Sequence, residues 1–333
     1  MLTATGACAV IWRKYNYMAM VQLGLHSLCC NKCDFCLIEE NHLDKIEDIL
    51  VEIDRAKENI KYIDSCKDNW SNKYSDGISL LGGEIFFVKD ERYKKAILEL
   101  IDVIIDYILK PSTNPRCRFS TVTNGIYDPE WLLFPVIDKI VDAVGLKFVD
   151  VNFSYDFKYR FHSEEARKRC EATINAFHKR YDNYQCGIQM IITQEVVDRY
   201  LDGWRTYNLI EEKFPGNMIS FLYPHPIHRG NNYKGTKNLQ GFNFTRSSFL
   251  KFLTLLRKEE PKVFESFLYS TRNSAVFKYT MMHEKMEAGT IDQNPRLSDG
   301  KEIINKKCNH SVLYQCYSDT EQCMLCDLEG FYF

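Results

Sequence analysis

Cysteine, a residue type that binds metals and carries redox chemistry, is concentrated in two short segments of this chain. In the first segment, HSLCCNKCDFC, the residues Cys29, Cys33 and Cys36 have a Cys-x3-Cys-x2-Cys spacing. Cys30 begins a second spacing, Cys-x2-Cys-x2-Cys, so the register of the ligands stays open. Three thiolates on one tight loop hold three irons of a [4Fe–4S] cluster and leave the fourth iron to a small molecule. A zinc loop is the alternative, although a closed zinc site usually takes a fourth protein ligand.

The second segment lies near the end of the sequence and holds Cys308, Cys316, Cys323 and Cys326. Four thiols so close together suit one metal centre. A [4Fe–4S] cluster bound by all four is the first interpretation, and zinc bound by the same four is the second. His310 is an alternative to one of the cysteines, and unligated cysteines remain the third interpretation.

The other cysteines of the chain are scattered, and we interpret them as small buried hydrophobic residues: Cys8, Cys66, Cys117, Cys170 and Cys186. The total of 13 cysteines is odd, and disulfide frameworks belong to small secreted domains. The first residues lack a basic head followed by an apolar run, so we expect no secretory signal. Metal or redox use of the clustered cysteines in a cytoplasmic protein is therefore the expectation.

Composition narrows the function classes further. The 333 residues include 43 basic and 45 acidic side chains, a net charge of -2, which argues against binding nucleic acid by phosphate neutralisation alone. Disorder is excluded by an apolar content of 45%, with 21 Phe and 20 Tyr. No apolar stretch is long enough to span a membrane, so we expect no membrane partner.

The elements that must position these cysteines alternate between strand and helix. Strands are predicted at residues 19–25, 77–81, 117–123, 147–154, 185–193 and 217–223. Helices are predicted between them, at residues 43–63, 91–109, 129–144, 163–181 and 195–214. This alternation predicts an α/β fold with a parallel sheet, either open or closed into a barrel. Ligand sites in such folds lie at the carboxyl ends of the strands, where the first cysteine segment falls.

The pattern changes after residue 223. A long loop and helices at 249–257 and 261–286 follow, and the last cysteines come after them. We therefore divide the chain into an N-terminal extension, a core, a loop and helical extension, and a Cys-rich metal-binding tail, at 1–18, 19–223, 224–300 and 301–333.

The order of these motifs resembles the radical S-adenosylmethionine (radical SAM) superfamily. Its signature is a Cys-x3-Cys-x2-Cys loop after the first strand with an aromatic residue, here Phe35, before the last cysteine. The second strand of that family ends in Gly-Gly-Glu, as the strand before Gly82, Gly83 and Glu84 does here. The resemblance covers about two thirds of the chain. It implies a partial (β/α)6 TIM-like barrel, with a helical and Cys-rich C-terminal extension, and an oxygen-sensitive [4Fe–4S] cluster on Cys29, Cys33 and Cys36.

The resemblance also implies contacts to S-adenosylmethionine from the ends of the strands. The residues that match these positions are Phe35, Gly82, Gly83, Glu84, Thr123, Asn124, Ser154, Asp156 and Gln189. Glycines permit a close approach of the backbone, and a carboxylate pairs with the ammonium of the cofactor. Each motif has a simpler interpretation: a tight turn for Gly-Gly-Glu and for Asn-Gly, and a cap of the next helix for Ser154 and Asp156.

The function implied is reductive cleavage of S-adenosylmethionine to a 5′-deoxyadenosyl radical that abstracts hydrogen from a substrate carbon. An electron donor such as flavodoxin or ferredoxin is then a partner. The tail is similar to the SPASM and twitch extensions of that superfamily, but it is too short for two auxiliary clusters. Because such tails often accompany peptide substrates, modification of a peptide or protein is the first hypothesis.

Two other hypotheses stay open. Modification of a nucleotide or nucleic-acid base is suggested by a basic stretch that also reads as a solvated helix face: Arg160, Arg167, Lys168, Arg169, Lys179 and Arg180. A non-catalytic iron–sulfur or zinc regulator is the third hypothesis, and Gly-Gly-Glu argues against it because a regulator needs no contact to a cofactor amino group.

Overall fold

The computed structural model describes residues 19–26, 28–31, 33, 45–65, 75–110, 117–182, 184–222 and 246–267. The chain divides into two compact units. The first comprises Met1–Asn31, Ile38–Ser154 and Glu165–Gly187, and the second comprises Lys32–Leu37, Tyr155–Glu164 and Ile188–Phe333. The domain boundaries expected from the sequence stay predictions, because 1–18 and the tail lie outside the described residues.

Six parallel strands form one sheet, in the same order as they occur along the chain. They are β1 (Ala19–Gly24), β2 (Ser75–Leu81), β3 (Arg118–Thr123), β4 (Val149–Ser154), β5 (Gly187–Ile191) and β6 (Met218–Leu222). Parallel neighbours need a crossover between them, and the helices of the chain supply it. The α/β fold with a parallel sheet that the alternation predicts is thereby confirmed.

The strand register of the first unit brings the strand ends to one edge. Gly24 pairs with Leu81 at the ends of β1 and β2, and Thr123 pairs with Phe153 near the ends of β3 and β4. Residues that follow these strands therefore emerge side by side. This edge is where the sequence places its polar and Gly-rich motifs.

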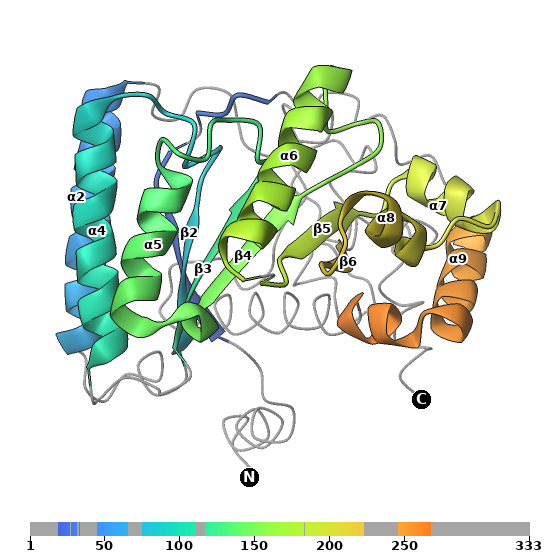
Figure 1. The fold of residues 1–333 in the computed structure, drawn as a ribbon. Helices are drawn as coiled ribbons and strands as arrows, with labels where there is room; N and C mark the ends of the chain where they lie inside the picture. The colour runs from blue at the N-terminus through green and yellow to red at the C-terminus, as the bar shows by residue number, and fades with distance from the viewer. Residues whose placement is uncertain are drawn as a thin grey trace, which may run out of the picture. The chain divides into compact units, whose positions relative to one another are not determined.

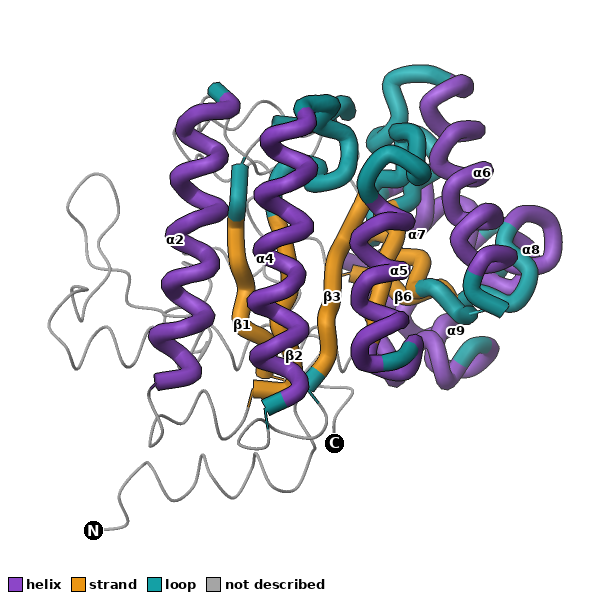
Figure 2. Tube along the Cα trace, turned by 60° about the vertical axis from the view of Figure 1, so that its left-hand side comes forward, coloured by secondary structure: helices purple, strands orange, loops and turns teal. Residues whose placement is uncertain are grey.

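Four helices alternate with the strands of the first unit: α2 (Ile46–Ser65), α4 (Glu91–Leu109), α5 (Leu133–Val144) and α6 (Glu164–Arg180). Helices α2 and α4 lie side by side over β1 and β2, and α5 lies next to α4 (Figures 1 and 2). Asp90 caps the start of helix α4, and its side chain accepts hydrogen bonds from the backbone N–H groups of Arg92 and Tyr93. On α6, Phe177 packs edge-on against Phe153 of β4.

Helix α5 and strand β4 begin later than the sequence predicts. The residues from 129 to 132 form a turn, and α5 starts at Leu133. A short 3-10 helix, Leu146–Phe148, precedes β4. Gly145, with φ +91, turns the chain between α5 and this helix, a conformation that glycine adopts without strain.

In the second unit, the single helix predicted at 195–214 is wrong. The structure has two helices there, α7 (Gln194–Leu201) and α8 (Thr206–Lys213). The break falls at Gly203, with φ +102, and at Arg205, whose guanidinium donates to the carbonyl groups of Tyr200 and Trp204. Helical spacing of apolar residues continues across this break, so periodicity alone does not reveal it.

Helix α9 (Arg246–Glu259) also belongs to the second unit, and residues 261–267 continue in helical form. Glu260 accepts hydrogen bonds from the backbone N–H and the hydroxyl of Thr206, which joins the end of α9 to the start of α8. The rest of the helix predicted at 261–286 lies outside the described residues. None of the described helices is both long and apolar enough to cross a membrane.

Candidate functional site

The segment that carries the first cysteines is hydrogen-bonded to the Gly-Gly-Glu turn. The backbone N–H of Leu25 donates to the carbonyl of Leu81 at 3.0 Å. The N–H of Gly83 donates to the carbonyl of His26 at 2.8 Å, and the N–H of Glu84 to that of Leu28 at 2.7 Å. This ladder continues the β1–β2 pairing beyond both strands. It fixes Glu84 against the residue that immediately precedes Cys29.

Gly82 has a steric reason to be glycine at this point. A Cβ atom built on Gly82 would lie 2.9 Å from the carbonyl oxygen of His26 and 2.9 Å from the Cδ1 of Ile85. The first of these atoms is backbone and cannot move aside without breaking the ladder. The close approach of the two loops therefore requires a residue without a side chain.

Glu84 is buried, with 1% of its surface exposed, and its carboxylate receives several donors. The hydroxyl of Thr123 lies 2.9 Å from both carboxylate oxygens, the backbone N–H of Asn124 lies 2.6 Å from Oε2, and that of Phe86 lies 3.2 Å from Oε1. An acceptor-only, ionised carboxylate suits this set of donors. Residues at the end of β3, Thr123 and Asn124, thus bind the carboxylate of Glu84, which follows β2.

Asn124 connects this carboxylate to the thiols. Its side-chain Nδ2 lies 3.4 Å from the Sγ of Cys29 and 3.6 Å from the Sγ of Cys30. The backbone N–H of Asn31 also donates to the Sγ of Cys29, at 3.4 Å. The Sγ of Cys30 also lies near two acceptors, the Oδ1 of Asn124 at 3.7 Å and the carbonyl of Ile126 at 3.8 Å. Cys29 therefore receives two N–H donors, whereas the sulfur of Cys30 lies between the amide of Asn124 and one backbone carbonyl.

The two neighbouring thiols share one hydrogen bond, and this bond couples their titration. It raises the pKa of Cys29, with a further rise from burial, and it lowers the pKa of Cys30. The charge of Glu84 disfavours a thiolate at either position. In the metal-free pair, the thiol of Cys30 therefore loses its proton more readily than the thiol of Cys29.

His26 and Tyr93 are buried next to the Gly-Gly-Glu turn. Neither residue was identified from the sequence. Burial lowers the pKa of His26 to about 4, so the imidazole is neutral at pH 7. The hydroxyl of Tyr93 donates to the carbonyl of Ile85 at 2.8 Å, and the Nε2 of His26 lies 2.9 Å from that hydroxyl. We infer that Nε2 carries the imidazole proton, because the only proton of Tyr93 is already used. The position of His26, just after a predicted strand, is the one signal in the sequence.

Two further predicted site residues, Asp156 and Cys33, lie in the second unit. Asp156 is 1% exposed and accepts hydrogen bonds from the N–H groups of Phe157 at 2.8 Å and Tyr159 at 3.0 Å. Burial raises the pKa of Asp156, and the charge of Arg160 opposes this rise. Asp156 thus orders the loop before α6 rather than the first turn of that helix. The Nη1 of Arg160 lies 3.8 Å from the Sγ of Cys33.

The remaining predicted site residues lie in strands β4 and β5 or outside the described residues. Ser154 ends β4 in the first unit and is 9% exposed, and Gln189 lies in β5 in the second unit. The residues Phe35, Cys36, Cys308, Cys316, Cys323 and Cys326 lie outside the described residues. Among the residues that are described, no group of three His, Cys, Asp or Glu is arranged to hold a metal ion. The structure therefore brings together Cys29, Gly82, Gly83, Glu84, Thr123 and Asn124.

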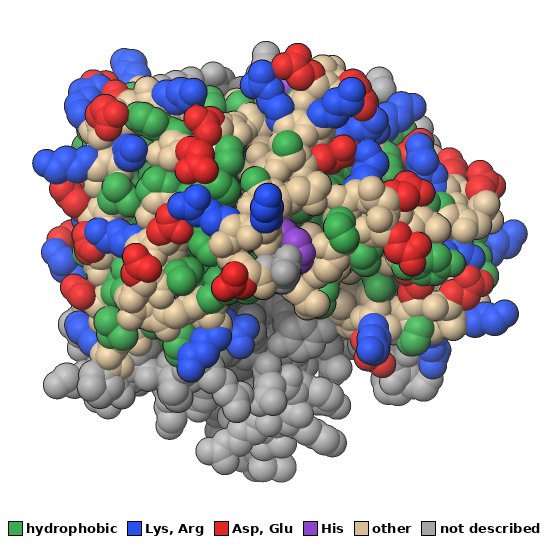
Figure 3. Space-filling view, viewed as in Figure 1, with side chains coloured by type: hydrophobic (Ala, Val, Ile, Leu, Met, Phe, Trp, Pro, Cys, Tyr) green, Lys and Arg blue, Asp and Glu red, His purple; other side chains and the backbone are tan. Residues whose placement is uncertain are grey.

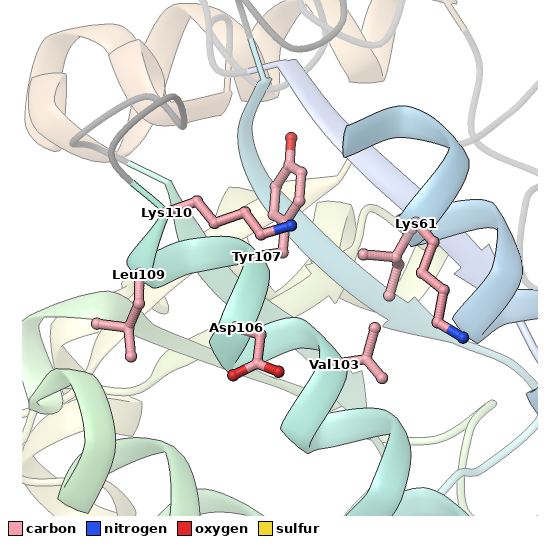
Figure 4. A pocket seen from close by; sticks show the side chains of 7 residues that line it. Lys61, Val103, Asp106, Tyr107, Leu109 and Lys110 are labelled. Atoms are coloured by element: carbon pink, nitrogen blue, oxygen red, sulfur yellow. The ribbon is translucent and has the colours of Figure 1, made fainter. Parts of the chain in front are cut away.

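A groove of about 400 Å³ lies elsewhere in the first unit, between the last turns of α2 and α4. It is lined by Ile60, Lys61, Val103, Asp106, Tyr107, Leu109 and Lys110 (Figure 4). Helix α4 starts beyond the carboxyl end of β2 and runs back along the sheet, so its last turn lies at the opposite edge. The groove is thus remote from the thiols and the buried carboxylate.

Among the scattered cysteines, the described ones are buried: Cys117, Cys170 and Cys186. This confirms the interpretation of these three as small core residues. Cys8 and Cys66 lie outside the described part of the chain. In comparisons with known proteins, no model of a protein family matches the chain, and no curated protein matches it either.

Proposed function

We propose that this chain is a radical S-adenosylmethionine enzyme built on a partial (β/α)6 barrel. The observation that carries the proposal is the ladder between the cysteine-bearing segment and the Gly-Gly-Glu turn. It joins, through backbone atoms, a thiol loop and a buried carboxylate at the carboxyl ends of adjacent parallel strands, the edge at which α/β folds bind ligands. A zinc loop or a simple tight turn gives no reason for a buried carboxylate at this position.

The residues present fit an iron–sulfur cluster and its cofactor. Thiolates are the ligands such clusters take, and Cys29 is half-buried among N–H donors, which stabilise a metal-bound sulfur. Cys30 has one N–H donor, the amide of Asn124, and two oxygen acceptors around its sulfur. A metal deprotonates the thiol that it binds. The lower pKa of Cys30 in the metal-free pair therefore does not decide which of the two cysteines is the ligand. Cys29, Cys33 and Cys36 are therefore the proposed ligands.

The other residues bind the cofactor and set the electrostatics. When bound, the cluster and S-adenosylmethionine supply an electron and a 5′-deoxyadenosyl radical that abstracts hydrogen from a substrate carbon. Glu84 pairs with the ammonium of the cofactor, and Gly82 lets the backbone come close. Asn124 holds Glu84 through its backbone and Cys29 through its side chain. His26 and Tyr93 exclude water from behind the turn.

For the substrate, modification of a peptide or protein remains the proposal. The nucleotide alternative rested on the basic stretch that includes α6, and several of its cations have acidic partners. Arg169 pairs with Glu165, Arg167 with Glu171 and Arg180 with Asp138, at 2.9, 3.9 and 2.8 Å. Figure 3 shows Lys, Arg, Asp and Glu side chains interspersed over the face in view. Such a surface offers no uniform positive field to a nucleic acid.

The test is production of 5′-deoxyadenosine by anaerobically reconstituted protein supplied with dithionite and S-adenosylmethionine. We expect the wild-type chain to form the product and Glu84→Gln to lose at least tenfold in rate, because the neutral amide cannot pair with an ammonium. The negative control combines Cys33→Ala with Cys36→Ala. Product formation that survives in this control, or no product from iron-loaded wild-type protein, refutes the proposal.

A further inference from the structure

Tyr127 lies on the loop after β3 and has no role in the function described so far. It is buried, and its hydroxyl lies 2.6 Å from the Oγ1 of Thr123, four residues earlier. Gly125 makes this return possible, because its φ of +67 turns the chain back toward the strand end. The backbone N–H of Gly125 also donates to the hydroxyl of Thr123, at 3.2 Å.

Counting protons gives the direction of each hydrogen bond. The hydroxyl of Thr123 has one proton, and the carboxylate of Glu84 at 2.9 Å only accepts. That proton therefore goes to Glu84. In the hydrogen bond between the two hydroxyl groups, Tyr127 must then be the donor and Thr123 the acceptor. The result is a chain of two hydroxyl groups that ends on the buried carboxylate, an arrangement in which each bond strengthens the next.

The ring of Tyr127 supports the same carboxylate from another side. It packs against Phe86, with ring centroids 5.9 Å apart. The backbone N–H of Phe86 donates to the Oε1 of Glu84 at 3.2 Å. Tyr127 therefore contacts two of the groups that hold Glu84, one through its hydroxyl and one through its ring.

We propose that Tyr127 is a positioning residue that orients Glu84 toward the ammonium of S-adenosylmethionine, acting through the hydroxyl of Thr123. The inference rests on the proposed function, because it assigns Glu84 to that ammonium. Burial and the charge of Glu84 raise the pKa of Tyr127 well above its ordinary value. Tyr127 thus stays protonated, and remains a donor, at neutral pH.

The experiment compares single and double variants of the hydroxyl chain. Tyr127→Phe removes one hydroxyl and keeps the ring against Phe86, and Thr123→Val removes the middle of the chain. Tyr181→Phe is the matched control, since its hydroxyl donates to Asp138 on α5 at 2.9 Å, outside the site. Dissociation constants of S-adenosylmethionine are measured for each protein after anaerobic cluster reconstitution. The same measurement is made with 5′-methylthioadenosine, which lacks the ammonium, and thermal unfolding midpoints are recorded.

We expect Tyr127→Phe to weaken binding of S-adenosylmethionine about fivefold, the effect of one lost hydrogen bond. Binding of 5′-methylthioadenosine should change less than twofold, as should all binding by Tyr181→Phe. The double variant should bind S-adenosylmethionine no more weakly than Thr123→Val, because Tyr127 acts only through Thr123. A merely structural role for Tyr127 would weaken both ligands equally.

The outcomes separate this inference from the proposed function. If iron-loaded wild-type protein does not bind S-adenosylmethionine, the function and the inference are both wrong. If it binds and Tyr127→Phe binds equally well, the inference alone is wrong. Equal weakening of both ligands, or additive losses in the double variant, also overturns the inference, because either result means that Tyr127 does not act through Thr123.

Discussion

Asn124 is the residue at which the two halves of the candidate site meet. Its backbone N–H binds the carboxylate of Glu84 at 2.6 Å, and its side-chain amide lies within 3.6 Å of two thiols. The Oδ1 of the same side chain accepts from the backbone N–H of Ile126 at 2.8 Å, which fixes the amide orientation. The amide of Asn124 therefore contacts both thiols, and Cys29 receives a further donor, the backbone N–H of Asn31.

Single substitutions test which of these neighbouring thiols is a cluster ligand. We expect Cys29→Ala to lose the iron of the first cluster and to abolish cleavage of S-adenosylmethionine. Cys30→Ala should retain both to within about threefold, because Cys29 receives two N–H donors and Cys30 receives one. Iron and sulfide content and 5′-deoxyadenosine yield are measured on both variants. An active Cys29→Ala together with an inactive Cys30→Ala would reverse the assignment.

At the scale of elements, the site depends on the close approach of two loops. Parallel pairing of β1 with β2 ends at Gly24 and Leu81, yet backbone hydrogen bonds continue as far as Leu28 and Glu84. The strands alone therefore do not hold the cysteine loop in place. The extra bonds do so, and they require a glycine where the loops come nearest.

Two glycine substitutions separate this requirement from the general cost of losing a glycine. A Cβ at Gly82 would lie 2.9 Å from a backbone oxygen, whereas a Cβ at Gly24 meets nothing within 4 Å. We expect Gly82→Ala to lower the free energy of unfolding by about 1–3 kcal/mol, because the loops must move apart. Gly24→Ala should change it by less than about 0.5 kcal/mol.

Denaturant unfolding of the two glycine variants supplies these values, and iron content after reconstitution shows whether the loop still binds a cluster. Equal stability and equal iron in the two variants would mean that the ladder does not position the cysteines.

At the scale of the whole molecule, the second group of cysteines remains a sequence-based prediction. The four thiols of the tail follow the last predicted strand of the core in the sequence. Metal binding commonly supplies folding energy to short segments. Coordination of one cluster by all four cysteines leaves no open iron, which favours electron transfer or stapling of the tail over direct binding of substrate.

Metal analysis of a variant that lacks Cys29, Cys33 and Cys36 tests the tail by itself. We expect about four irons and four sulfides per chain to remain after reconstitution. One zinc and no iron would identify a structural zinc site instead. Neither metal in a protein that still unfolds cooperatively would refute both interpretations of the tail. The intact chain, reconstituted in parallel, is the control for full loading.

The alternation of strands and helices, the parallel sheet and the position of the cysteine loop after the first strand could all be predicted from the sequence. Each depends on local periodicity or on glycine, which act over a few neighbouring residues. The glutamate and the asparagine could be nominated because they follow predicted strands closely and match motifs of the superfamily that the sequence resembles.

Only the tertiary structure decided what these residues contact. Tyr127, His26 and Tyr93 carry no motif, and their importance comes from hydroxyl and imidazole groups that meet across separate loops. The sequence did not reveal the break between α7 and α8 for a related reason. The apolar spacing continues across it, while Arg205 binds one carbonyl in the last turn of α7 and one between the two helices. Hydrogen bonds between residues distant in sequence depend on register and turn geometry, and a pattern read along one chain does not contain them.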